Sequence, residues 1–158
     1  MSVGVRKKDR KIQIFILTFA FLGVLFTISD ARAERLAVNK EIANIRSGPG
    51  DSYEVLWQVE KNMPFEIIDK DKTGNWYYVK DYEGTIGWIK KNLLSKIDSV
   101  VAIPKTECNV RVTPTAEGNI SFKAVKGVPF KVLERKGEWL HVQHTDGDEG
   151  WIHKSMVW

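Results

Sequence analysis

The residues best suited to chemistry in this chain are one cysteine, Cys108, and three histidines. A thiol beside an imidazole is a nucleophilic pair, and Cys and His side chains together form zinc sites. An internal repeat of the chain tests both possibilities, because His141, His144 and His153 match Tyr78, Asp81 and Lys90 in the first copy. These are ordinary outward strand or turn positions without ligand spacing. We therefore expect no metal site.

Cys108 itself matches Ala43 in the repeat, in a stretch where small or apolar residues alternate with polar ones. Such alternation places both residues on the inward face of a strand. We interpret Cys108 as a small core residue, and the alternative interpretation is a nucleophile or an intermolecular thiol. As the only cysteine, it cannot form an intrachain disulfide.

Paired carboxylates would suggest a glycosidase, which needs two of them about 5 to 10 Å apart in a cleft. The adjacent acids Asp148 and Glu149 match Thr85 and Ile86 in the first copy, so we expect solvated turn residues there. No pair stands out, so we predict no glycosidase site.

Aromatic residues that alternate away from the core are the strongest candidates for binding. Tyr77 and Val79 share an apolar parity with Leu140 and Val142, so Trp76 should lie on the opposite face. The aromatic set comprises Tyr53, Trp76, Tyr78 and Trp88 in the first copy and Trp139, His141 and Trp151 in the second. Two interpretations remain: a loop folds over these rings to make a second small core, or the rings form a platform for a sugar or an extended peptide.

An arginine accompanies the rings in each copy, Arg46 in the first and Arg111 in the second. Each could take a ligand carboxylate bidentately, or form an ion pair with an acid of its own loop. The predicted ligand-binding residues are Tyr53, Trp76, Tyr78, Trp88 and Arg46, with Trp139, Trp151 and Arg111 as a weaker second set.

The repeat begins at Asn44 Ile45 Arg46 Ser47 Gly48 Pro49 Gly50 and returns as Asn109 Val110 Arg111 Val112 Thr113 Pro114 Thr115. The copies stay aligned to Pro64 Phe65 and Pro129 Phe130, then slip by two residues before Trp76 and Trp139. Such a slip between fixed blocks indicates a shortened hairpin loop. Because threonines replace Gly48 and Gly50, we expect the two glycine-proline loops to differ in shape.

Short alternating segments separated by turn residues predict an all-β fold of five short strands per copy. The predicted core is Trp57, Phe65, Tyr77, Val79 and Ile89 in the first copy and Phe122, Phe130, Leu140, Val142 and Ile152 in the second.

The N-terminal segment combines a basic run, an apolar stretch from Ile12 to Ile28 and the small-x-small triplet Ala31 Arg32 Ala33. This pattern is typical of a cleaved signal peptide, residues 1–33, and the alternative is an inner-membrane anchor formed by residues 12–28. Six of the 24 Lys and Arg and two of the 20 Asp and Glu lie in residues 1–33, which leaves 18 of each charge. A neutral remainder lacks the basic footprint of a nucleic-acid binder.

The first copy resembles the bacterial SH3-like (SH3b) domain in the order of its motifs. These are Asn-Ile-Arg-Ser-Gly-Pro-Gly, Val-Leu-Trp, Pro-Phe, an isolated Trp, Gly-Trp-Ile and a closing Leu-Leu. The second copy resembles it in Asn109 Val110 Arg111, Pro114, Pro129, Trp139 and Gly150 Trp151 Ile152. The resemblance implies two tandem five-stranded SH3-like barrels, residues 34–95 and 96–158. It also implies a noncatalytic binding module of exported proteins, without a cofactor.

The resulting hypothesis is a periplasmic or secreted protein that binds a cell-envelope component, with peptidoglycan or its peptide or glycan parts as the foremost ligand. An adaptor that binds envelope proteins is the first alternative, and an enzyme using Cys108 is the second. Contact with a membrane is expected only through an uncleaved signal segment.

Overall fold

The computed structural model describes residues 33–158, which belong to one compact unit. The expected signal peptide and the alternative anchor at residues 12–28 lie outside the described residues. Between residues 33 and 158, no helix is long and apolar enough to span a membrane.

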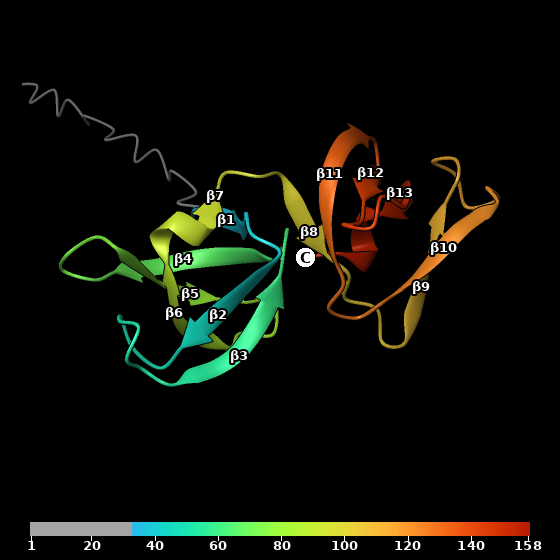
Figure 1. Cartoon of the computed structure of the whole chain (residues 1–158). Coiled ribbons are helices and arrows are strands. Elements are labelled where there is room, and N and C mark those ends of the chain that lie inside the picture. Colours follow the sequence, from blue (N-terminus) through green and yellow to red (C-terminus); the bar gives the residue numbers. More distant parts are fainter. Residues whose placement is uncertain (1–32) are drawn as a thin grey trace, which may run out of the picture. The chain divides into compact units, whose positions relative to one another are not determined.

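The first copy of the repeat forms a seven-stranded antiparallel sheet (Figure 1). Its strands are β1 (Arg35–Val38), β2 (Ile42–Arg46), β3 (Val55–Glu60), β4 (Pro64–Lys70), β5 (Trp76–Lys80), β6 (Ile86–Lys90) and β7 (Leu94–Ser95). They lie in the order β3-β2-β6-β5-β4-β1-β7.

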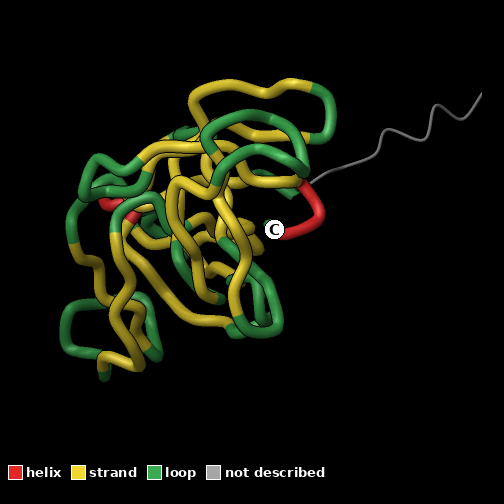
Figure 2. The backbone as a smooth tube through the Cα atoms, turned by 90° about the vertical axis from the view of Figure 1, so that its right-hand side faces the viewer, coloured by secondary structure: helices red, strands yellow, loops and turns green. Residues whose placement is uncertain are grey.

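The second copy forms a six-stranded sheet in the same order, β10-β9-β13-β12-β11-β8. Its strands are β8 (Ser99–Val101), β9 (Glu107–Arg111), β10 (Ile120–Val125), β11 (Pro129–Lys136), β12 (Trp139–Gln143) and β13 (Glu149–His153). Helical structure within residues 33–158 is limited to two 3-10 turns, η1 (Lys91–Leu93) and η2 (Lys154–Met156) (Figure 2).

The predicted all-β fold of two similar units is confirmed, and each sheet contains more strands than the predicted five. The predicted five correspond to β2–β6 and β9–β13, and the additional strands β1, β7 and β8 come from the segments before and between these two groups. β1 pairs with β4, with Leu36 opposite Phe65, and β8 pairs with β11, with Val100 opposite Phe130. These pairings join segments about 30 residues apart.

The predicted core is confirmed in full for seven of the ten side chains. Phe65, Val79, Ile89, Phe130, Leu140, Val142 and Ile152 are buried. Trp57, Tyr77 and Phe122 are half-buried and pack against the two core clusters from their edges. Cys108 and Ala43 are both buried in equivalent cluster positions, which confirms that Cys108 faces inward.

The two copies share their irregular features as well as their strands. A bulge interrupts the register between Ile67 and Asp69, and another lies between Val132 and Glu134 at the equivalent place. The change in alignment between the two copies lies in the hairpin after each bulge. Residues 71–75 connect β4 to β5, whereas only residues 137–138 connect β11 to β12. The predicted shortened loop is therefore confirmed.

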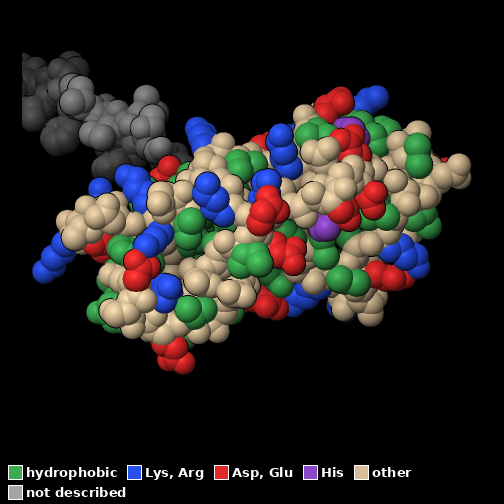
Figure 3. Space-filling model, in the orientation of Figure 1, with side chains coloured by type: hydrophobic (Ala, Val, Ile, Leu, Met, Phe, Trp, Pro, Cys, Tyr) green, Lys and Arg blue, Asp and Glu red, His purple; other side chains and the backbone are tan. Residues whose placement is uncertain are grey.

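Contacts across the junction of the two sheets involve the last residue of the chain. The guanidinium of Arg35 on β1 lies 3.7 Å from the ring centre of Trp158. Val101 on β8 is buried in the core cluster of the first sheet and exchanges two backbone hydrogen bonds with Trp158. Elsewhere, Lys126 forms a 2.6 Å ion pair with Glu83. The face in Figure 3 shows acidic and basic side chains intermixed over the surface.

Candidate functional site

The predicted aromatic face exists in the first sheet as a row of side chains across three strands. Arg46 on β2 is opposite Trp88 on β6, and Trp88 is opposite Tyr78 on β5. The rings of Tyr78 and Trp88 have centroids 5.0 Å apart and are tilted by 34°. Both rings are half-buried, so each keeps a surface that a ligand can reach. An aromatic pair of this kind presents an apolar surface with a polar edge.

Trp76 differs from these neighbours and corrects the expectation of an outward, accessible ring. It lies outside the core cluster, as the strand alternation predicts, yet it is only 8% exposed. Lys90, its strand partner on β6, places its ammonium 5.6 Å from the ring centre. Trp76 is therefore a covered side chain beside the platform, in line with the second-core interpretation for this one residue.

Arg46 is held by the loop that follows β2 rather than left free. Its Nη1 donates to the carbonyl oxygens of Asp51 and Tyr53 at 3.0 and 2.8 Å. The Asp51 carboxylate lies 3.9 Å from Nη2 of Arg46 and 2.5 Å from Nζ of Lys90. Of the two sequence-based interpretations of Arg46, the ion pair with a loop acid describes its present contacts.

Tyr53 packs its ring against the backbone of the same loop. A Cβ atom at Gly48 would stand 2.3 Å from the Tyr53 ring, closer than atoms approach. Tyr53 is nevertheless 48% exposed. Gly48 is therefore required for space, because its φ is not in the left-handed region.

The backbone hydrogen bonds of the two loops overturn the prediction that the loops differ in shape. Gly50 and Tyr53 donate to the carbonyls of Gly48 and Gly50, and Thr115 and Gly118 donate to Thr113 and Thr115 in the same pattern. The second loop keeps the same backbone hydrogen bonds with the larger and smaller side chains exchanged: Thr113 replaces Gly48, and Gly118 replaces Tyr53. The threonines are tolerated because these positions do not need positive φ.

The weaker second set lies at the equivalent places of the second sheet. Arg111 is opposite Trp151, which is opposite His141, and the His141 and Trp151 rings stack with centroids 5.0 Å apart. Trp139 is half-buried, and His153 packs edge-on against it at 5.2 Å. Arg111 donates one hydrogen bond, 2.6 Å long, to the carbonyl of Gly118.

A groove runs beside the arginine in each sheet, and six equivalent positions define it. The first groove is lined by Asn44, Arg46, Asp51, Gln58, Trp76 and Lys90. The second groove is lined by Asn109, Arg111, Ala116, Lys123, Trp139 and His153. Their volumes are about 340 and 620 Å³, so the second groove is the more open. Sequence reasoning missed Asp51 and Lys90, although Lys90 is the direct strand partner of Trp76.

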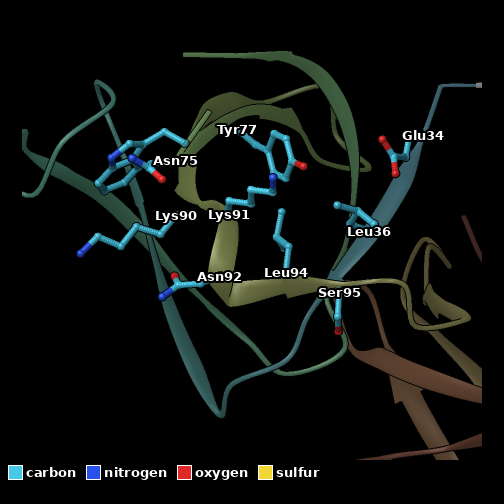
Figure 4. A pocket seen from close by; sticks show the side chains of 10 residues that line it. Glu34, Leu36, Asn75, Tyr77, Lys90, Lys91, Asn92, Leu94 and Ser95 are labelled. Atoms are coloured by element: carbon cyan, nitrogen blue, oxygen red, sulfur yellow. The ribbon is translucent and has the colours of Figure 1, made fainter. Parts of the chain in front are cut away.

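A larger hollow of about 780 Å³ (Figure 4) adjoins the first groove. Trp76 and Lys90 line both hollows. Lys91 and Asn92 of turn η1 form one side, with the ammonium of Lys91 5.9 Å from the ring centre of Tyr77. Strand alternation did not reveal this hollow, because two of its polar residues, Lys91 and Asn92, come from a 3-10 turn.

Cys108 borders the second groove together with His153, so the alternative of a catalytic thiol can be examined directly. Burial raises the pKa of the Cys108 thiol, whereas a nucleophilic cysteine needs a lowered pKa. Nδ1 of His153 is engaged 2.7 Å from the Ser155 hydroxyl. Residues 33–158 hold no group of three or more His, Cys, Asp and Glu side chains arranged to bind a metal.

Comparison with known proteins identifies relatives among cell-wall enzymes. The chain is 25% identical to the "Putative N-acetylmuramoyl-L-alanine amidase YrvJ" of Bacillus subtilis, over 95% of this chain and 30% of that protein. It is 28% identical to the "Probable cell wall amidase LytH" of Staphylococcus epidermidis, over 68% of this chain and 38% of that protein. The "Uncharacterized protein YgiM" of Escherichia coli is also 28% identical, over 70% and 53%.

The chain thus spans about a third to a half of the length of these relatives. Among solved structures it is similar to an NlpC/P60 family protein from Bacillus cereus, with 13% identity and a TM-score of 0.37 over 79% of this chain and 56% of that one. The family model described as the bacterial SH3 domain matches twice, at residues 39–96 and 104–158, and covers most of the chain. The protein therefore belongs to the bacterial SH3 domain family, with two such domains in tandem.

Proposed function

We propose that this chain is an exported, noncatalytic protein that binds peptidoglycan in the cell envelope. The observation that carries the proposal is that the described residues are made of two bacterial SH3 domains similar in sequence to parts of two cell-wall amidases. The matched part is the minor share of each amidase, as expected for a targeting module beside an enzyme.

The aromatic row of the first sheet supports a polymer ligand. The Tyr78 and Trp88 rings form a half-buried apolar surface, and Arg46 on the neighbouring strand lies opposite Trp88. Sugar rings have an apolar face that stacks on such surfaces, and their hydroxyls need hydrogen-bonding partners at the rim. Peptidoglycan supplies both a glycan and a peptide.

A noncatalytic role is supported by the side chains of the second groove. Its thiol is buried and hard to ionise, and its imidazole is engaged by a serine. Neither side chain is poised as the activated pair that thiol catalysis requires. An extracytoplasmic location is supported by the cell-wall relatives and by the signal-like pattern of residues 1–33.

The test is sedimentation of the purified protein with protein-free peptidoglycan sacculi. We expect the wild-type protein in the pellet and a Trp88→Ala variant largely in the supernatant. Leu133→Ala, an exposed apolar residue at a bulge of the second sheet, is the matched control and should sediment like the wild type. A wild-type protein that stays in the supernatant at all ratios would overturn the proposal.

A second candidate is an adaptor for envelope proteins, and one observation favours it. β3 and β10 are the end strands of their sheets, and Val55, Leu56 and Ile120 on them are exposed. Open sheet edges with apolar side chains can add a strand from a partner. Capture of one envelope protein by the wild type, lost on Leu56→Glu without loss of sacculus binding, would identify this activity.

A further inference from the structure

The first groove already contains a carboxylate, and it comes from the chain itself. The Asp51 side chain reaches from the loop to a position between Arg46 and Lys90, 3.9 and 2.5 Å away. The Lys90 ammonium also lies over the Trp76 ring, so the groove combines two cations with an aromatic ring. The protein thereby shows which chemical group fits this constellation.

The second groove preserves the arginine and the tryptophan but lacks the internal acid. Ala116 occupies the position of Asp51, in a loop with the same backbone hydrogen bonds. His153 occupies the position of Lys90 and packs against Trp139. The volume of this groove is about 620 Å³, against 340 Å³ for the first groove.

Charge in the second groove is unbalanced at Arg111. The other cation of the lining, Lys123, forms an ion pair with Glu107, which also lines the groove. Among residues 33–158, Arg111 has no carboxylate partner and makes a single side-chain hydrogen bond, to the Gly118 carbonyl. Its guanidinium keeps donors available in the planar arrangement that matches a carboxylate.

We propose that the second groove binds a carboxylate of an external peptide, with Arg111 as the donor and Trp139 as the apolar wall beside it. Arg111 binds the ligand carboxylate in the way that Arg46 pairs with the Asp51 carboxylate in the first groove. The peptide backbone then follows the groove over Trp139 toward Asn109, whose amide can bond a peptide group. Resting on the proposed function, this inference identifies the ligand as a short peptide stem of the cell wall with free carboxylates.

The test measures binding of a synthetic stem tetrapeptide (alanine, isoglutamate, lysine, alanine) to the full chain by titration calorimetry. One sample of the peptide has free carboxylates, and another has both carboxylates converted to amides. We expect one site per chain and binding of the free acid at least about tenfold tighter than that of the amide. Arg111→Gln should remove this preference.

Arg135→Gln is the matched control, because it removes one guanidinium from the same domain at an exposed ion pair with Asp98, outside the groove. It should keep the preference for the free acid. Equal binding of acid and amide by the wild type, or loss of the preference in both variants, would overturn the inference.

Two further variants move the internal carboxylate between the grooves. Ala116→Asp should place an acid beside Arg111 and weaken binding of the free acid by about tenfold or more, with an unchanged melting temperature. Asp51→Ala should free the first groove and raise the stoichiometry from one to two. Unchanged binding by the folded Ala116→Asp variant would also overturn the inference.

Sacculus sedimentation separates this inference from the proposed function. If the wild type sediments with sacculi but does not distinguish acid from amide, peptidoglycan binding stands and the carboxylate site is wrong. If it neither sediments nor binds the tetrapeptide, both are wrong.

Discussion

At the scale of single residues, the same side-chain type has different roles on the same face of one sheet. Trp76 and Trp88 both alternate away from the core, yet Trp76 is covered and Trp88 keeps a reachable ring. The strand partners differ, because Lys90 extends over Trp76 whereas the tilted Tyr78 ring lies beside Trp88.

This difference predicts separable effects of truncating the aromatic rings. Tyr78→Ala or Trp88→Ala should weaken sacculus binding by about 1 to 3 kcal/mol, as hot-spot aromatics do, with little change in melting temperature. Trp76→Ala should lower the melting temperature first, because a buried ring is lost. Calorimetric unfolding alongside sedimentation checks both. If Trp88→Ala unfolds as readily as Trp76→Ala, the rings form a second core instead of a platform.

A second prediction concerns the thiol of Cys108. Because burial raises its pKa and leaves it 8% exposed, the native protein should react slowly with iodoacetamide and the urea-unfolded protein quickly. Mass spectrometry of quenched samples gives both rates. Rapid labelling of the native protein would show an accessible, activated thiol and revive the catalytic alternative.

At the scale of elements, the two loops reach one backbone shape with opposite side-chain sizes. Gly48 lies against the Tyr53 ring in the first loop, and Thr113 lies against Gly118 at the equivalent positions of the second loop. The pair is therefore exchanged as a unit, which single-position comparison of the repeats does not reveal.

The exchange predicts coupling between the two positions of the first loop. Gly48→Thr alone should destabilise the protein by about 1 kcal/mol, because the new Cβ displaces the Tyr53 ring. Adding Tyr53→Gly should recover part of this loss, and a double-mutant cycle from urea unfolding measures the coupling. Additive losses would show that the two positions act independently.

The strands of the first sheet also carry a cross-strand charge row. Glu66 on β4 lies between Arg35 on β1 and Lys80 on β5, at 3.3 and 2.7 Å. The hydrogen bonds from Lys80 and Arg35 lower the pKa of the Glu66 carboxyl, with burial opposing them.

This lowered pKa predicts the sign of the acid dependence. A carboxyl with a lower pKa in the folded state stabilises the protein above its unfolded pKa of about 4.3, and this stabilisation is lost as pH falls through the folded pKa. Glu66→Gln should therefore reduce stability at neutral pH and flatten the decline below about pH 4.3. Urea unfolding at several pH values measures this. A variant that keeps the wild-type acid slope would exclude Glu66 as its source.

At the scale of the whole molecule, the end of the second domain contributes to the first. Trp158 packs against the first core cluster and stacks on Arg35, and Val101 of β8 is buried in that cluster. The stability of the two domains should therefore be linked.

Removing the terminal ring tests this linkage. We expect Trp158→Ala to lower the melting temperature of the first domain and to split one calorimetric transition into two, at a cost of about 1 to 3 kcal/mol for the lost packing. Met156→Ala, a change to an exposed residue of η2, is the control. A single unshifted transition in Trp158→Ala would show that the contact contributes nothing to stability.

The sequence by itself determined the repeat, the strand faces and most of the core. This was possible because strand side chains alternate with period two, and comparison of two copies shows which parity stays apolar. Phe65, Val79 and Cys108 were placed inside on this basis, and all three are buried. The shortened hairpin was also readable, since a change in loop length leaves the register on both sides intact.

Only the tertiary structure decided which rings are covered and which groove is open. These properties depend on pairs distant in the chain: β1 with β4, Lys90 over Trp76, and Asp51 against both Arg46 and Lys90. Strand alternation specifies the face of the sheet on which a residue lies, but it does not specify how closely a loop covers that face. The accessible groove lies in the less typical repeat, because Ala116 there removes the carboxylate that occupies its counterpart.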